Sequence, residues 1–186
     1  MQTQTKVFPG MLNNSTEFFN SENGLMFINN GQVKSFFDLP FAIIKILTEA
    51  ISNDLPAKVL LNDWFPNQKM KQLEQFISCR FGGLDHIPDL NDGVLQDGEY
   101  HDCPRSGMCA GEGIICKLPS YNGHQFSKVE IKVMQLSTTE MTNEVIADTL
   151  MLPLGSFHKI KSIIHETIGA VTKQGITKFA QMRNII

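Results

Sequence analysis

The 186-residue sequence predicts a mainly α-helical protein with a small α+β domain at its amino terminus and a bundle of four helices at its carboxy terminus. Two stretches repeat apolar residues at helical spacing, and a stretch rich in Gly, Pro, Asp and Cys separates them. We therefore expect a hairpin and helical domain over 1–81, a cysteine-rich segment over 82–125 that could pack on it, and a helical domain over 126–186. The apolar content of 42% is sufficient for a buried core.

Charge is distributed unevenly along the chain. Residues 1–125 carry 9 Lys+Arg against 14 Asp+Glu, whereas residues 126–186 carry 7 against 5. This modest carboxy-terminal excess permits contact with phosphates without demanding it. No stretch approaches the roughly 20 apolar residues of a membrane span, and the first residues lack the organisation of a signal peptide. We expect a cytoplasmic protein that does not enter the membrane.

The amino-terminal domain begins with polar residues. Because residues 1–22 are rich in Asn and Ser, we expect an irregular lead-in. A β-hairpin is expected next, because Asn29-Asn30-Gly31 separates the apolar runs 25–28 and 32–37, and Asn and Gly tolerate positive φ.

Three amphipathic helices are expected before residue 82. Asp38 offers a cap for the first, Pro56 precedes the second over 57–64, and the third covers 69–80. The residues expected to face inward are Phe41, Ile44, Leu47 and Ile51 in the first helix and Met70, Leu73, Phe76 and Ile77 in the third. Such stripes predict core packing of the helices against one another.

Four cysteines mark the irregular segment and the helix before it. Cys79 is followed after 23 residues by Cys103, after five more by Cys109 and after six more by Cys116. A segment with so little apolar content needs another source of order, and a zinc ion or an iron–sulfur cluster bound by these thiolates would supply it, with His101 as an alternative ligand. Because no C-x-x-C pair is present, two other interpretations of the cysteines stay open: free thiols and a redox-active disulfide.

The same region contains polar side chains of the types that act in catalysis. These side chains are His86, His101, Asp85, Asp102 and Glu112. A Cys–His pair could provide a nucleophile. The sequence contains no nucleophile elbow, P-loop, dinucleotide fingerprint or metalloprotease helix, so we expect no enzymatic activity and name no catalytic residue.

Capping residues divide the last third of the chain into helices. Ser127 and Glu130 have the spacing of a capping box, Thr142 can cap a second helix, and Ser156 can cap a third after a tight turn over 153–155. Two short helices joined by a turn, the second amphipathic and basic outside, fit a helix-turn-helix.

The order of these features resembles the carboxy-terminal domain of the LuxR/GerE family of transcriptional regulators. Ser127 and Glu130 match the family's opening, residues 142–147 (TNEVIA) resemble its scaffold helix, residues 156–158 stand at the start of its recognition helix, and residues 168–170 (IGA) resemble its closing Leu-Gly-Val. The resemblance implies a transcriptional regulator that binds double-stranded DNA. It covers the last third of the chain only, so the input received by residues 1–125 is not identified.

The resemblance also implies which side chains meet DNA. They are Thr142, Asn143, Ser156, His158, Lys159, Lys161, Ser162 and Lys173. Glu144-Val145 replaces the family's Lys-Glu pair and His158 replaces its recognition lysine, which lowers the expected affinity. An adaptor module that has kept the scaffold and lost DNA affinity is therefore the alternative. A fourth helix over 174–186 could form a homodimer or pack into the core.

Overall fold

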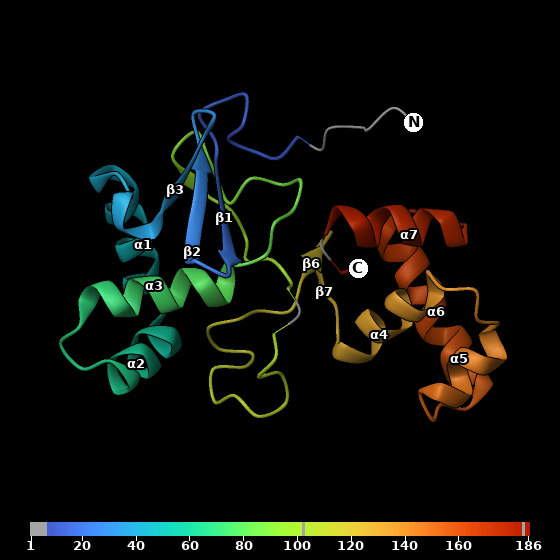
Figure 1. The fold of residues 1–186 in the computed structure, drawn as a ribbon. Coiled ribbons are helices and arrows are strands. Elements are labelled where there is room, and N and C mark those ends of the chain that lie inside the picture. Colours follow the sequence, from blue (N-terminus) through green and yellow to red (C-terminus); the bar gives the residue numbers. More distant parts are fainter. Residues whose placement is uncertain (1–6, 102, 184) are drawn as a thin grey trace. The chain divides into compact units, whose positions relative to one another are not determined.

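The computed structural model describes residues 7–101, 103–183 and 185–186 (Figure 1). These residues form seven α-helices, which make the chain 45% helical, and small antiparallel sheets. The class is mixed α+β, which is broader than the mainly α class expected from sequence. The chain divides into two compact units, the first ending at Lys117 and the second beginning at Leu118.

The first unit contains a five-stranded antiparallel sheet in the order β3-β2-β1-β4-β5. Its strands are β1 (Thr16–Ser21), β2 (Gly24–Asn29), β3 (Gln32–Ser35), β4 (Leu90–Asn91) and β5 (Val94–Leu95). The predicted hairpin is confirmed as β2–β3, whose turn residues Asn30 and Gly31 have φ values of 50° and 72°. The irregular lead-in is wrong for residues 16–21, because β1 is the middle strand of the sheet.

Polar residues in β1 concealed this strand in the sequence. Thr16 and Glu17 are buried like the neighbouring Phe18, and the side chain of each accepts a hydrogen bond from another segment of the unit. The Asn29 side chain donates to Thr16 Oγ1 at 2.9 Å, and Glu17 Oε1 accepts from the Asp85 backbone at 2.8 Å. Burial of these polar groups depends on segments far away in the sequence, so the local pattern predicted a loop.

Three helices complete the core of the first unit, with a short 3-10 turn η1 (Phe36–Asp38) before them. They are α1 (Phe41–Asn53), α2 (Leu55–Trp64) and α3 (Lys69–Arg80), and the bounds of α3 agree with the prediction. Asp54 caps α2, with Oδ1 accepting from the Ala57 N–H at 3.2 Å.

Parts of the predicted helix faces need correction. Asp38 does not cap α1, which begins after Pro40 without a side-chain cap. Phe41 is 80% exposed and Met70 44% exposed, whereas Ile43, Leu47 and Ile51 provide the buried side of α1. The first residue of a helix has no preceding turn to pack with, so an apolar side chain there can stay outside the core.

The second unit begins with the short hairpin β6 (Ser120–Tyr121) and β7 (His124–Gln125). Four helices follow: α4 (Lys128–Ser137), α5 (Asn143–Thr149), α6 (Leu154–Ile168) and α7 (Lys173–Met182). The hairpin belongs with these helices, because the Tyr121 ring lies 5.1 Å from that of Phe179 and Asn122 Nδ2 donates to the Thr167 carbonyl at 3.0 Å. The boundary between units therefore precedes the one expected at residue 126.

Two of the three predicted caps in this unit are confirmed. Ser127 and Glu130 form the capping box of α4, and Thr142 caps α5. The Ser156 cap is wrong, because α6 begins at Leu154 after Pro153 and Ser156 lies in its first turn. Proline at this junction has its φ set and needs no backbone donor, so the helix starts three residues earlier than a Ser156 cap predicts.

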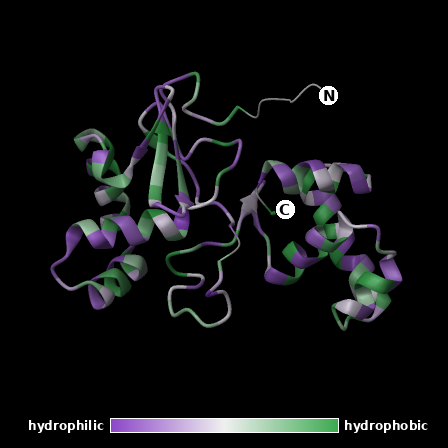
Figure 2. Cartoon of the chain, in the orientation of Figure 1, coloured by the Kyte–Doolittle hydropathy of each residue, from purple (hydrophilic) through white to green (hydrophobic). Residues whose placement is uncertain are grey.

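Apolar and polar residues alternate along the helices of the second unit, as Figure 2 shows in green and purple. The residues buried there are Phe126, Ile131, Val133, Met134, Ile146, Ala147, Phe157, Ile164, Ile176, Ala180 and Ile185. Among the described residues, no helix combines the length and the apolar character that crossing a bilayer requires.

Candidate functional site

Helices α5 and α6 pack together and are joined by a tight turn. Ile146 and Ala147 on α5 and Phe157 on α6 are each at most 2% exposed. In the turn, the Leu152 N–H donates to the Ala147 carbonyl at 2.9 Å, and Met151 adopts a φ of 54°. The turn therefore lies at 150–152, before the predicted 153–155. With α6 anchored by Phe157 and Ile164, its opposite face is left to solvent.

The residues expected to meet DNA differ in exposure. Six are exposed: Thr142, Ser156, His158, Lys159, Ser162 and Lys173. Lys161 and Asn143 are half-buried, and Lys161 Nζ donates to Asn143 Oδ1 at 2.9 Å. This bond joins α6 to the start of α5.

The Lys161 ammonium also lies near that of Lys173. Burial first, and then the charge of Lys173, lower the pKa of Lys161. Lys173 Nζ in turn donates to the Thr139 carbonyl, which lies before α5. The structure thus gathers Asn143, Lys161 and Lys173, which come from three different helices, at one place on the second unit.

Two acidic residues lie among these side chains. Hydrogen bonds from its own backbone N–H and from the Thr142 side chain lower the pKa of Glu144, and the nearby His158 adds to this effect. Glu166 Oε1 accepts from Ser162 Oγ at 3.3 Å, one turn along α6. Both carboxylates oppose phosphate binding where they stand.

Helix α7 places most of its apolar side chains inside the unit. Ile176 and Ala180 are fully buried, and the Phe179 ring lies 5.1 Å from Tyr121 and 5.7 Å from Phe126. Of the apolar side chains on α7, Met182 is the exposed one, at 45%. Core packing therefore occupies the apolar side of this helix.

In the first unit, the cysteine-rich segment returns to the end of α3. All four cysteines are free and half-buried. Burial raises the pKa of the Cys79 thiol, a hydrogen bond from Gln75 opposes this, and the charges of Cys116, Cys103 and Cys109 raise it further. Hydrogen bonds from Arg80 to Ile114 and Ile115 hold the segment against the end of α3, but no three of the described sulfur atoms lie within 4.8 Å of one another.

The other polar residues considered for catalysis are dispersed. His86 stacks on the Phe8 ring at 5.3 Å, and the Glu112 carboxylate accepts from Ser106 Oγ and from the Gly107 N–H, both at 2.9 Å. Asp85 belongs to a separate acidic cluster, and Asp102 lies outside the described residues.

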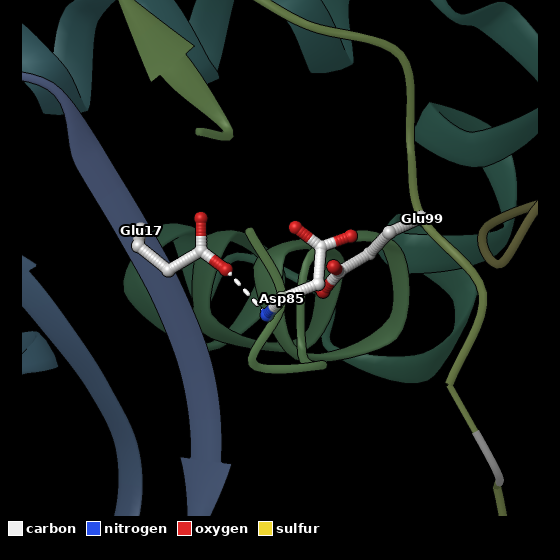
Figure 3. Close-up of side chains that lie close together, drawn as sticks. All are labelled: Glu17, Asp85 and Glu99. Carbon is white, nitrogen blue, oxygen red and sulfur yellow. Dashed lines mark hydrogen bonds between the residues drawn. The ribbon is translucent and has the colours of Figure 1, made fainter. Parts of the chain in front are cut away.

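That acidic cluster joins β1 to the loops after α3 (Figure 3). One oxygen from each of Glu17, Asp85 and Glu99 lies within 4.8 Å of the others. Asp89 is buried beside them, and its Oδ2 accepts from the Phe18 N–H at 2.7 Å. The bonds of Glu17 with the Asp85 N–H and of Asp89 with the Phe18 N–H join residues 85–89 to β1, and Glu99 accepts from the Gly83 N–H within the loops.

Burial controls the protonation of this cluster. Loss of water raises the pKa of Glu17 to about 9 and that of Glu99 to about 10, and neighbouring carboxylates contribute to both increases. Burial followed by the charge of Glu17 also raises the pKa of Asp89. The oxygens have the chemistry to ligate a hard divalent cation. Without a cation, these pKa values favour carboxyls that keep their protons near neutral pH, and Glu17 Oε2 and Glu99 Oε2 are buried with no hydrogen-bond partner.

The sequence did not reveal this cluster. Glu17 lay in the expected lead-in, Asp85 and Asp89 lay in a polar loop, and Glu99 lay ten residues further on. Acidic residues in such stretches are usually solvated, and only their tertiary neighbours show that they are buried.

Comparison of the chain with protein-family models, with curated proteins and with solved structures finds no match to any of them.

Proposed function

We propose that the chain is a DNA-binding transcriptional regulator that acts through α5 and α6 as a LuxR-like helix-turn-helix, within a cytoplasmic protein. The arrangement of the second unit supports this proposal most directly. The buried side of α6 anchors the helix on α5, and its outer face presents His158, Lys159 and Ser162 to solvent. A helix fixed in this manner can enter a major groove with that face toward the bases.

Electrostatics around this surface support phosphate contacts. From Ser156 onward, the sequence contains one acidic residue, Glu166, and five basic ones: Lys159, Lys161, Lys173, Lys178 and Arg183. Lys161 donates to Asn143 and Lys173 donates to the Thr139 carbonyl, so Lys159 is the better placed of the three for a phosphate contact. The exposed amino terminus of α6 adds backbone donors that favour an anion.

A salt-dependent binding assay tests the proposal. The full chain is mixed with a random-sequence duplex at low salt, and anisotropy is followed as salt is raised. We expect retention at low salt and a linear fall in log K with log salt. Lys159→Ala should reduce the magnitude of the salt slope by about 1, as loss of one phosphate contact does.

A matched lysine provides the control. Lys132 is exposed on α4, and Lys132→Ala should leave the slope unchanged. Folded protein that shows no retention at low salt would contradict the proposal. That result would favour the second candidate, a protein-interaction module with the same scaffold, for which Glu144 beside His158 is the supporting observation.

A further inference from the structure

We propose that Cys79, Cys103, Cys109 and Cys116 bind one zinc ion as four thiolates, and that this ion fastens residues 103–116 to the end of α3. The site is separate from the DNA-binding surface proposed above and does not depend on it. Four thiolates satisfy the tetrahedral preference of structural zinc without any other ligand.

Two segments distant in the sequence carry these cysteines, and the backbone fixes them side by side. Cys79 lies in the last turn of α3 and packs against the core. The next residue, Arg80, donates from Nε to the Ile115 carbonyl at 2.7 Å and from an Nη to the Ile114 carbonyl at 2.8 Å. Since Cys116 follows Ile115 directly, these bonds hold Cys116 beside the end of α3.

Gly111 brings two more of the sulfur atoms to one place. Its N–H donates to Cys109 Sγ at 3.3 Å, and its carbonyl accepts from Cys116 Sγ at 3.7 Å. A Cβ at this glycine would lie 2.6 Å from Trp64 Cη2 and 3.5 Å from Cys109 Sγ. The close approach requires glycine, and the N–H directed at sulfur would stabilise a thiolate bound to metal.

The segment around these residues has almost no apolar core of its own. Between residues 103 and 113 the one large apolar side chain, Met108, is 86% exposed. Backbone turns supply some order, such as the Ser106 N–H to the Cys103 carbonyl at 2.9 Å and the Glu112 N–H to the Cys109 carbonyl at 3.1 Å. A bound ion would provide the cross-link that burial does not.

The four thiols are not at metal-binding separation without the ion. Among the described residues, no three of the sulfur atoms lie within 4.8 Å of one another. Binding of one ion would therefore draw residues 103–116 closer to Cys79.

The test uses the full chain, purified under reducing conditions with its metal. Elemental analysis should find about one zinc per chain, in keeping with one four-coordinate structural site. Replacement by cobalt should give sulfur-to-metal charge-transfer bands and the visible bands of a tetrahedral thiolate site. Trp64 is the only tryptophan and lies against Gly111, so cobalt should also quench its fluorescence.

Variants identify the ligands. Cys→Ser at each of the four positions should weaken cobalt binding by at least about tenfold, since even second-shell changes cost that much. His101→Ala is the matched control and should leave the cobalt spectrum unchanged. If the His101→Ala variant instead loses the cobalt spectrum, the four-cysteine ligand set is overturned and His101 is a ligand.

A measurement on the unaltered chain tests the zinc site even if the Cys→Ser variants fail to fold. Titration with an organic mercurial should release zinc in proportion to the thiols modified. The proposal is overturned if the chain contains no metal and takes up no cobalt, or if mass spectrometry finds a disulfide between these cysteines. Sulfide with visible colour in the fresh protein would overturn zinc in favour of an iron–sulfur cluster.

Discussion

The two units of the chain are stabilised by different kinds of contact. Among its described residues, the second unit buries eleven apolar side chains, not counting Pro119, and two polar ones, Glu130 and Ser137. The first buries seven polar or charged side chains beside its apolar core: Ser15, Thr16, Glu17, Gln72, Arg80, Asp85 and Asp89. Most of these connect the sheet and helices to loops that have few apolar residues. We infer that loops without an apolar face can be fixed by buried polar groups, and that such a unit then depends on pH and on individual hydrogen bonds.

Unfolding experiments can separate the two units. Trp64 lies in the first unit and is the only tryptophan of the chain, so its fluorescence follows that unit. Far-ultraviolet circular dichroism follows the helices of both units. A variant that destabilises the first unit should therefore shift both the fluorescence transition and part of the circular dichroism transition. A variant that destabilises the second unit should shift the circular dichroism transition alone.

The largest effect is expected for Arg80→Met. Arg80 is 7% exposed, pairs with Asp54 at 2.9 Å and donates to two backbone carbonyls of the cysteine-rich segment. Burial alone would raise the pKa of Asp54, but hydrogen bonds from Arg80 and Ala57 outweigh this and lower it. Removing one partner of a buried ion pair costs about 3 to 5 kcal/mol of unfolding free energy.

Denaturant titration followed by Trp64 fluorescence measures this loss. Arg105→Met, which changes an exposed arginine in the same segment, is the matched control and should have an effect within about 0.5 kcal/mol. Equal effects of the two variants would show that the buried arginine does not hold the first unit together.

An intermediate effect is expected from the acidic cluster through pH. The folded pKa of Glu17 is about 9 against 4.5 in the unfolded chain, so the native state holds the extra proton between these values. Stability from this group is full below pH 4.5 and is lost as pH rises toward 9. Between pH 5 and 8, the loss should be about 2 to 4 kcal/mol, at 1.36 kcal/mol per pH unit.

Glu17→Gln should reduce this dependence, because glutamine keeps a hydrogen-bonding side chain that does not ionise, while Glu99 still contributes. Fluorescence-detected unfolding at several pH values provides the comparison with the unaltered chain. If wild-type stability instead rises from pH 5 to 8, the cluster does not retain its protons. Stabilisation by calcium or magnesium at pH 8 that disappears in Glu17→Gln would assign it to a cation.

The smallest effect is expected in the second unit, at the capping box of α4. Ser127 Oγ accepts from the Glu130 N–H, and Glu130 Oε2 accepts from the Ser127 N–H at 2.7 Å. Ser127→Ala should cost about 1 kcal/mol, a typical value for loss of a helix cap. Circular dichroism should detect this loss while the Trp64 transition stays in place.

Ser127→Thr retains the hydroxyl and should recover most of the stability. The comparison between units would be weakened if Ser127→Ala also shifted the Trp64 transition. That result would mean that the two units unfold together.

Local sequence patterns were sufficient to predict the elements whose conformation depends on neighbouring residues. The Asn30-Gly31 turn, the bounds of α3 and the caps at Ser127 and Thr142 were all predicted, because each depends on a few neighbouring residues. The start of α6 was misplaced by three residues, because Pro153 and Ser156 both suit the start of a helix and the local pattern favoured the serine.

Tertiary structure decided whatever depends on partners distant in the chain. The middle strand β1 escaped prediction because Glu17 is paired by Asp85, and the acidic cluster escaped for the same reason. The sequence could suggest a metal site from the number of cysteines, but only the bonds from Arg80 to residues 114 and 115 bring Cys116 back beside Cys79. A periodic apolar pattern can be recognised from residues that are neighbours in the sequence. A buried polar contact can be recognised only when the fold has brought both partners together.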